Sequence, residues 1–221
     1  DDPVGHWEFI FNQYRDLGCK GFGELTAKIY WDDPRMLAML EACERVGFPV
    51  IFHTSTEADL GYGVLDEPGL PHLETVVKRF PKLPFLGHSP GFWSEISAAA
   101  TVDEKRSYPK GKVTAPGTVH RLMRAYPNMY GDLSAGSGLN ALTRDPDHAA
   151  VFIEEFQDRI LLGLDYCSIT NDMRHVEWLT NARDTGRITE TAYEKIMWRN
   201  ADRLLGLGIG TAGADPGQPC G

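Results

Sequence analysis

The sequence predicts an α/β fold with a parallel sheet, and two observations lead to it. Short apolar runs that end in a polar residue recur along the chain, and segments with helix start and stop signals separate them. The runs cover residues 19–25, 48–54, 84–89, 128–134 and 159–166. Strands that alternate with helices in this way are typical of βα units, whose strands run parallel.

The helical segments are identified by their end residues. A helix around 7–17 precedes the first run. Asp33 and Pro34 form an N-cap and first-turn pair for the next helix, and Gly47 supplies its stop. Four further helices are expected. They cover 72–80 and 118–126, begin at Asp145 and Pro146, and follow the N-cap Thr189.

Two regions lack such periodicity. Residues 90–116 contain several Pro and Gly residues and predict a loop over the mouth of a barrel rather than a second domain. Residues 208–221 predict a flexible C-terminal tail. The sequence therefore predicts one domain over 1–207, followed by that tail.

Composition excludes several classes of function. A formal net charge of -9 disfavours nucleic acid as a partner. The sequence holds no apolar run of the roughly 18–20 residues that span a membrane. Its four cysteines are far apart and form no CxxC pair, which predicts reduced thiols and a cytoplasmic location. A small-molecule substrate is the expected partner, and a homo-oligomer is possible.

The residues able to do chemistry stand where the runs end. Glu24, His53, His88, Asp132 and Asp165 each close a different run, about one βα unit of ~30 residues or a little more apart. In parallel α/β barrels the C-terminal ends of the strands share one rim, so all five side chains should meet there. Each alone has a simpler explanation: a strand-end histidine is usually structural, and Asp165 resembles an N-cap.

Imidazoles combined with carboxylates indicate a divalent metal site. This ligand set suits Zn²⁺, Mn²⁺ or Fe²⁺, and we expect zinc. A bound ion acidifies a water molecule and polarises a substrate oxygen while a nearby carboxylate relays the proton. Asp165 is the candidate for that relay. Asp132 is expected to support the site through hydrogen bonds rather than to bind the ion.

Five motifs, in order, resemble the second half of the amidohydrolase-related family. They are FHT at 52–54, LGHSPGFW at 86–93, YPNMYGDLS at 126–134, DRILLGLDY at 158–166 and RNADRLLGL at 199–207. The family includes metal-dependent hydrolases of lactones and amides and the decarboxylases related to aminocarboxymuconate semialdehyde decarboxylase. The resemblance implies a (β/α)8 TIM barrel with His53 as a metal ligand and Asp165 as a ligand and proton shuttle. It implies that His88 binds a second metal or holds substrate and water, and that Glu24 bridges metals. A surface carboxylate is an equally good interpretation of Glu24.

One departure from the family concerns its first strand. The His-x-His pair that completes the family's metal site is missing from this sequence. Counting back from Glu24 as strand four predicts a barrel truncated to about strands 4–8. Such a chain should hold its ion weakly.

Three functions remain open at this stage. The leading hypothesis is a metal-dependent hydrolase of a lactone, amide or ester. The alternatives are a metal-dependent decarboxylase of a small carboxylic acid and an inactive truncated homologue. The predicted substrate contacts are Lys28, Trp93 and Arg144, where Arg144 either clamps a substrate carboxylate or pairs with Asp145 or Asp147 on the surface.

Overall fold

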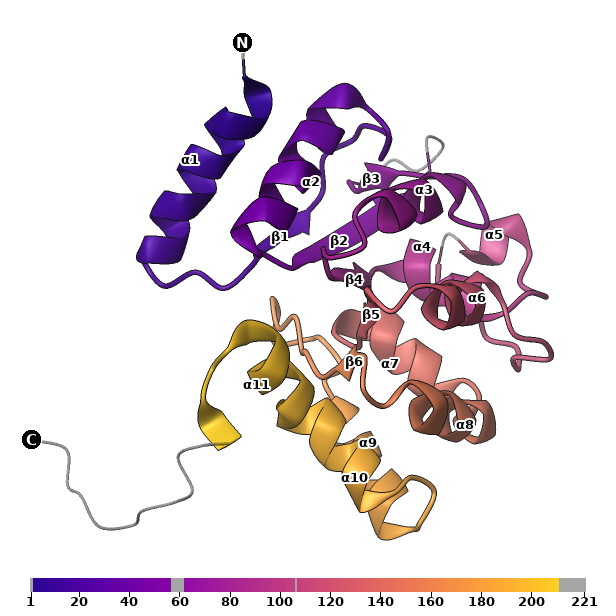
Figure 1. The fold of residues 1–221 in the computed structure, drawn as a ribbon. Coiled ribbons are helices and arrows are strands. Elements are labelled where there is room, and N and C mark those ends of the chain that lie inside the picture. Colours follow the sequence, from indigo (N-terminus) through magenta and orange to yellow (C-terminus); the bar gives the residue numbers. More distant parts are fainter. Residues whose placement is uncertain (1, 57–61, 106, 211–221) are drawn as a thin grey trace, which may run out of the picture.

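A parallel sheet forms the centre of the computed structural model, which describes residues 2–56, 62–105 and 107–210. Its hydrogen-bonded order is β1-β2-β4-β5-β6, every pair is parallel, and β3 pairs with the end of β2 (Figure 1). The strands are β1 (Phe22–Leu25), β2 (Val50–Ser55), β3 (Val64–Leu65), β4 (Phe85–His88), β5 (Met129–Asp132) and β6 (Ile160–Leu161). The predicted α/β fold with consecutive parallel strands is confirmed.

Helices connect the strands and cover the sheet. The first part of the chain contributes α1 (Pro3–Asp16), α2 (Pro34–Val46), α3 (Pro71–Arg79), α4 (Pro90–Trp93), η1 (Ser94–Ile96) and α5 (Val102–Lys105). The second part contributes α6 (Thr118–Ala125), α7 (Ala135–Thr143), α8 (Pro146–Phe156), α9 (His175–Asp184), α10 (Glu190–Glu194), η2 (Lys195–Arg199) and α11 (Asn200–Leu205). Helices α1 and α2 lie side by side at one end of the molecule (Figure 1).

The helix ends follow the predicted signals. The Asp33 side chain accepts a hydrogen bond from the Arg35 N–H at the start of α2, and Gly47 ends that helix with φ 82°. Asp145 caps α8 through the His148 N–H, and Thr189 caps α10 through the Ala192 N–H. In each case a side-chain oxygen satisfies a first-turn N–H that has no partner within the helix.

The structure also differs from the sequence-based expectations. Residues 90–116, predicted as loop, include α4, η1 and α5. Helix α7 was not predicted, because Gly136 and Gly138 weaken the helical propensity of its sequence. The fifth apolar run forms only a two-residue strand, β6, so Asp165 lies four residues beyond its end. Of the predicted tail, residues 211–221 lie outside the described part of the chain.

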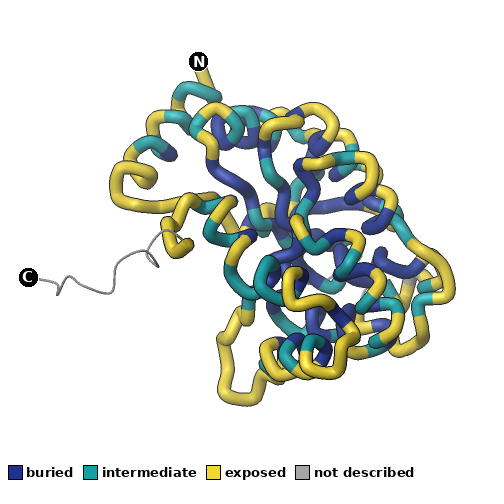
Figure 2. Tube along the Cα trace, turned by 60° about the horizontal axis from the view of Figure 1, so that its bottom comes forward, coloured by how far each residue is buried: buried dark blue, intermediate teal, exposed yellow. Residues whose placement is uncertain are grey.

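Alternation along β2 separates the packing face from the chemical face. Val50 and Phe52 are fully buried, and the Phe52 ring meets Trp31 edge-on with 4.9 Å between ring centroids. Burying one such aromatic side chain contributes about 1.5–3 kcal/mol. His53 points to the opposite side, since successive strand residues alternate faces. The buried residues lie along the middle of the molecule, and the exposed surfaces of the helices lie outside them (Figure 2).

Two strand glycines allow α4 to pack closely on the sheet. A Cβ at Gly87 would lie 2.3 Å from the Phe92 ring, and a Cβ at Gly131 would lie 2.8 Å from the Trp93 ring. Any side chain at these positions would push α4 away from β4 and β5. The glycine that precedes His88 and the one that precedes Asp132 therefore serve packing rather than backbone flexibility.

A pair of histidines joins α6 to α8 beneath the sheet. The Nε2 atoms of His120 and His148 are 3.1 Å apart, and His120 also packs against Phe152. Both Nδ1 atoms are buried without a hydrogen-bond partner among the described residues. Burial, together with the nearby charges of His148 and Arg124, lowers the pKa of His120 to about 4. Burial also lowers the pKa of His148. This contact therefore depends on neutral imidazoles.

Acid should weaken the contact between α6 and α8. An unfolded histidine titrates near pH 6.5, so the unfolded state binds more protons between about pH 6.5 and 4, and the free energy of unfolding falls as pH drops through that window. We expect a loss of about 3 kcal/mol. In His120→Gln, whose amide keeps a donor and an acceptor but does not titrate, the pH dependence should be shallower. Urea unfolding at a series of pH values between 4 and 7 measures the pH dependence of the free energy of unfolding.

The matched control is His6→Gln, because His6 is exposed on α1. It should reproduce the wild-type pH dependence. Equal slopes for His120→Gln and the wild type would show that the pair is not the acid-sensitive contact.

Candidate metal centre

Three side chains from neighbouring strands converge at the C-terminal edge of the sheet. Glu24 comes from β1, His53 from β2 and His88 from β4, and each offers one ligand atom within 4.8 Å of the other two. Glu24 Oε1 lies 2.8 Å from His53 Nδ1 and 3.6 Å from His88 Nε2. We call these three residues the strand-end cluster.

Strand register brings the cluster together. His53 and His88 are directly paired across β2 and β4, and their ring centroids are 5.8 Å apart. One strand further along, Gly87 pairs with Gly131, which sets Asp132 beside His88. Parallel strands in register deliver equivalent positions to one rim. The predicted strand-end positions of Glu24, His53, His88 and Asp132 match the structure.

His88 is held through one ring nitrogen, which leaves the other facing the cluster. Its Nδ1 lies 2.9 Å from Asp132 Oδ2 and 3.0 Å from the Ser134 hydroxyl, which itself donates to Asp132. An ionised carboxylate only accepts hydrogen bonds, so Nδ1 carries a proton. The other nitrogen, Nε2, faces Glu24 and Asp165. Asp132 thus makes the predicted supporting hydrogen bond.

The two cluster histidines have opposite pKa shifts. Burial lowers the pKa of His53, and the nearby Glu24 only partly offsets this. Burial also acts to lower the pKa of His88, but the hydrogen bond and charge of Asp132, with the charges of Glu24 and Asp165, raise it overall. His53 is therefore the less basic of the two imidazoles and His88 the more basic. Titratable neighbours driven apart in this way are typical of sites that divide acid and base roles.

Asp165 lies beside the cluster rather than in it. Its Oδ2 is 3.9 Å from His88 Nε2, and 51% of its side chain is exposed. The residue has φ 54°, and Ser89, which follows His88, has φ 94°. Non-glycine residues in this sparsely populated region tend to gather at functional sites. A side-chain rotation of Asp165 toward the cluster would add a second carboxylate.

Glu24 lies close enough to each cluster imidazole to share a divalent cation with it. Two ligand atoms on one ion with bonds of ~2.1 Å are at most ~4.2 Å apart. The separations between Glu24 Oε1 and the two imidazole nitrogens fall inside this limit. Carboxylate and imidazole ligands form a borderline to hard donor set, which suits zinc and manganese.

The predicted substrate contacts lie in three different environments. Trp93 is 3% exposed, and its indole N–H donates to the Asp132 carbonyl at 2.8 Å, so the ring supports β5 from within the core. Arg144 follows α7 and lines a small hollow formed by the segment 97–112. Lys28 is exposed in the segment that follows β1. Packing accounts for Trp93 better than substrate contact does.

Two residues at the site were missed by sequence analysis. Ser134 stands two residues after Asp132, and its hydroxyl completes the support of His88. The Tyr62 ring lies tilted beside that of His53, with ring centroids 4.5 Å apart, and burial with the charges of Glu24 and Asp165 raises the pKa of Tyr62. The motif that carries Ser134, YGDLS, indicated its position. Tyr62 stands in a glycine-rich stretch with no comparable signal.

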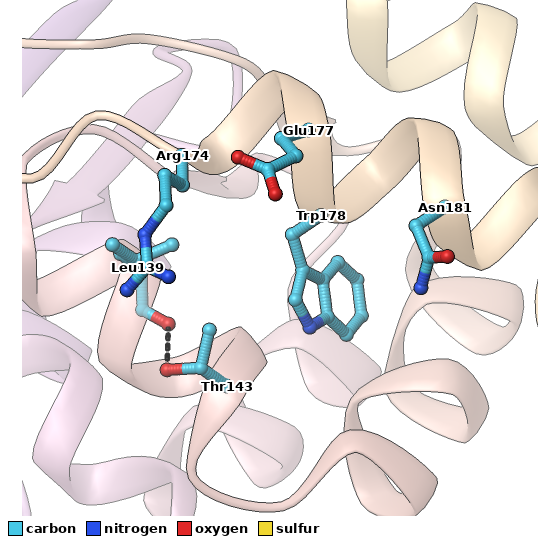
Figure 3. Close-up of a pocket in the computed structure, with 6 residues that line it drawn as sticks. All are labelled: Leu139, Thr143, Arg174, Glu177, Trp178 and Asn181. Carbon is cyan, nitrogen blue, oxygen red and sulfur yellow. Dashed lines mark hydrogen bonds between the residues drawn. The ribbon is translucent and has the colours of Figure 1, made fainter.

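A hollow beside α7 lies apart from this cluster. It opens between α7 and α9, where Leu139 and Thr143 face Arg174, Glu177, Trp178 and Asn181 (Figure 3). Arg174 is already paired with Asp172 at 2.7 Å. The hollow contains none of the strand-end residues.

Comparison with known proteins decides the family. The family model described as Amidohydrolase matches residues 14–207. This chain belongs to the amidohydrolase family. No protein of curated function matches the sequence.

Several solved structures share the fold of this amidohydrolase. 2,6-Dihydroxybenzoate decarboxylase from Rhizobium is 16% identical with TM-score 0.51, and the match covers 93% of this chain and 68% of that one. Dihydroxybenzoic acid decarboxylase from Polaromonas sp. JS666, with bound manganese and 2-nitroresorcinol, is 17% identical with TM-score 0.54, and the match covers 94% of this chain and 67% of that one. 5-Carboxyvanillate decarboxylase from Sphingomonas paucimobilis is 17% identical with TM-score 0.53, and the match covers 92% of this chain and 63% of that one. The chain thus spans about two thirds of these proteins' length.

A further feature concerns membranes. Within the described residues, the amidohydrolase chain has no helix that is both long and apolar enough to cross a bilayer.

Removing the Glu24 carboxylate should weaken metal binding. Glu24→Gln keeps the side-chain shape but removes the charge shared by both imidazoles, and we expect Mn²⁺ affinity to fall by about 100-fold or more. Electron paramagnetic resonance of free Mn²⁺ measures this. Glu177→Gln is the control, since Glu177 is an exposed carboxylate in the separate hollow of Figure 3. Equal affinities for Glu24→Gln and the wild type would exclude Glu24 as a ligand.

Proposed function

We propose that this amidohydrolase chain carries the metal centre of a divalent-metal-dependent decarboxylase acting on a small carboxylic acid. The observation that carries the proposal is the orientation of His88. Asp132 and Ser134 hold its Nδ1, and its Nε2 faces Glu24 and Asp165 at the rim.

Decarboxylation needs a placed proton donor. When the bond between a substrate carbon and its carboxylate breaks, CO₂ leaves without the bonding electron pair, and the carbon must take up a proton. His88, with its raised pKa, can present an Nε2 proton to that carbon and regain a proton from solvent afterwards. Asp132 stabilises the charged imidazole during this cycle.

The remaining residues suit the binding of a cation. We propose that His53 and Glu24 hold the ion and that Asp165 joins them by rotation. When bound, the ion orients substrate oxygens and stabilises negative charge on them. Zinc remains a prediction, and manganese is the other candidate, because the Polaromonas relative binds it.

The relatives favour decarboxylation over hydrolysis. All three described above are named as decarboxylases of hydroxylated aromatic acids. The sequence-based preference for a hydrolase therefore gives way to the decarboxylase alternative. A hydrolase remains the second candidate, because Asp165 stands 3.9 Å from His88 Nε2, where a carboxylate could accept a proton from water.

A carbon dioxide release assay tests the proposal. The chain is loaded with Mn²⁺ or Zn²⁺ and offered carboxyl-labelled hydroxybenzoates, with a lactone and an amide in parallel. We expect metal-dependent release of label as CO₂. Asp165→Asn should lower kcat by about 100-fold or more with little loss of fold stability. Hydrolysis of the lactone or amide without CO₂ release would favour the hydrolase, and no turnover by folded, metal-loaded protein would favour an inactive homologue.

The role of His88 can be separated from metal binding. His88→Ala should abolish turnover but keep Mn²⁺ affinity within about tenfold of the wild type, since a proton donor is not a ligand. Loss of metal and turnover together would make His88 a ligand instead.

The rate should also depend on pH in a defined direction. Since the charged form of His88 donates the proton, kcat should fall as pH rises through its raised pKa. Asp132→Asn removes the neighbouring charge, so the fall should move to lower pH. A profile that does not move would remove His88 from the proton transfer.

A further inference from the structure

Two nitrogens of the Arg144 guanidinium group are buried without a hydrogen-bond partner among the described residues. Arg144 is the C-cap of α7, and its backbone N–H bonds to the Asn140 carbonyl. The side-chain Nε and Nη2 atoms are buried, and neither has a hydrogen-bond partner among the described residues. Burial lowers the pKa of Arg144, although the charges of Asp145 and Glu104 oppose this. An arginine side chain remains charged at neutral pH even so.

A half-buried charge without hydrogen bonds is costly. The carbonyl end of α7 offers partial compensation, because a helix C-terminus carries partial negative charge. It does not supply the paired, hydrogen-bonded acceptor that a guanidinium requires. An anion would supply such an acceptor.

The carboxylates around Arg144 already accept other hydrogen bonds. Glu104 lies beside the same hollow, but its Oε2 accepts hydrogen bonds from the N–H of Thr101 at 2.8 Å and from its hydroxyl at 3.0 Å. Asp145 is likewise used, since it accepts from the Val113 N–H at 3.0 Å and caps α8. Neither carboxylate forms an ion pair with Arg144 in the described contacts.

A hollow of about 60 Å³ lies between Arg144 and the segment 97–112. Lys112, Glu104 and Ser97 line it together with small residues and Pro109. This volume holds a few water molecules or one small oxyanion. The walls are fixed on both sides, because Asn140 Nδ2 donates to the Pro109 carbonyl and Val113 bonds to Asp145.

The local charge also favours an anion. The chain as a whole carries a formal net charge of -9, but the charged residues that line the hollow are two cations, Arg144 and Lys112, and one carboxylate, Glu104. A second cation makes the hollow attractive to a negative group even in an acidic protein.

We propose that Arg144 and Lys112 form a binding site for a small oxyanion, a phosphate or carboxylate group, between the end of α7 and the segment 97–112. The site is separate from the strand-end cluster. Helix α7 begins just after β5, and Arg144 follows its last residue, about 13 Å further along the helix axis. An anion there would link Lys112 to the end of α7, near the contacts of Asn140 with Pro109 and of Asp145 with Val113.

Calorimetric titration with inorganic phosphate tests this proposal. The protein is stripped of metal by a chelating resin, so that phosphate cannot bind through an ion at the strand-end cluster, and ionic strength is held constant. Wild-type protein should show saturable binding at one site. Arg144→Met should weaken it by about tenfold or more, and Lys112→Met by several-fold. A parallel titration with acetate separates a carboxylate site from a phosphate site.

Two controls keep the result interpretable. Lys110→Met removes a cation from the same segment but not from the lining, so it should bind phosphate as the wild type does. If Arg144→Met does not fold, Lys112→Met, which changes an exposed residue, still reports the site. Equal binding by the wild type and the folded variants would overturn the proposal. So would binding that appears only in Glu104→Gln, because Glu104 would then be the counter-ion of Arg144.

Discussion

The candidate site depends first on the parallel hydrogen-bond ladder between β2 and β4. That ladder pairs Val50 with Phe85 and continues in register to His53 and His88. A shift of one residue would turn one imidazole toward the helices, because strand side chains alternate between faces. The distances within the strand-end cluster follow from this register, and so does the position of Asp132 on the next strand.

Packing and chemistry meet in α4. The Phe92 and Trp93 rings lie against the backbone of Gly87 and Gly131, directly before His88 and Asp132. Trp93 also bonds to the Asp132 carbonyl. Packing on the core side of the sheet thus fixes the positions of His88 and Asp132, whose side chains lie on the other side. A larger residue at either glycine would therefore disturb the orientation of His88 as well as the core.

Local signals in the sequence were sufficient for the helix caps and for four of the strand-end residues. Asp33 with Pro34, and Asp145 with Pro146, mark helices because capping is decided within a few residues. The positions of His53 and His88 at strand ends could be predicted for the same reason, because each follows directly on a short apolar run. The segment after β6 could not be predicted, since the positive φ of Asp165 depends on surrounding structure rather than on its own sequence. The environment of Arg144 depends on residues more than thirty positions away in the sequence, so a carboxylate clamp and a surface ion pair could not be distinguished from sequence. Among the described contacts, Arg144 forms no ion pair with Asp145 or Asp147.

The central claim is that the register of the sheet builds one cation site from residues on separate strands. Crystals of the chain soaked in Mn²⁺ and measured at the manganese absorption edge test it most directly. The account predicts one anomalous peak with Glu24 and His53 at bonding distance, about 2.1 Å, and Asp165 rotated toward it. A peak elsewhere on the molecule, with His53 and Glu24 still hydrogen-bonded to each other, would contradict the account.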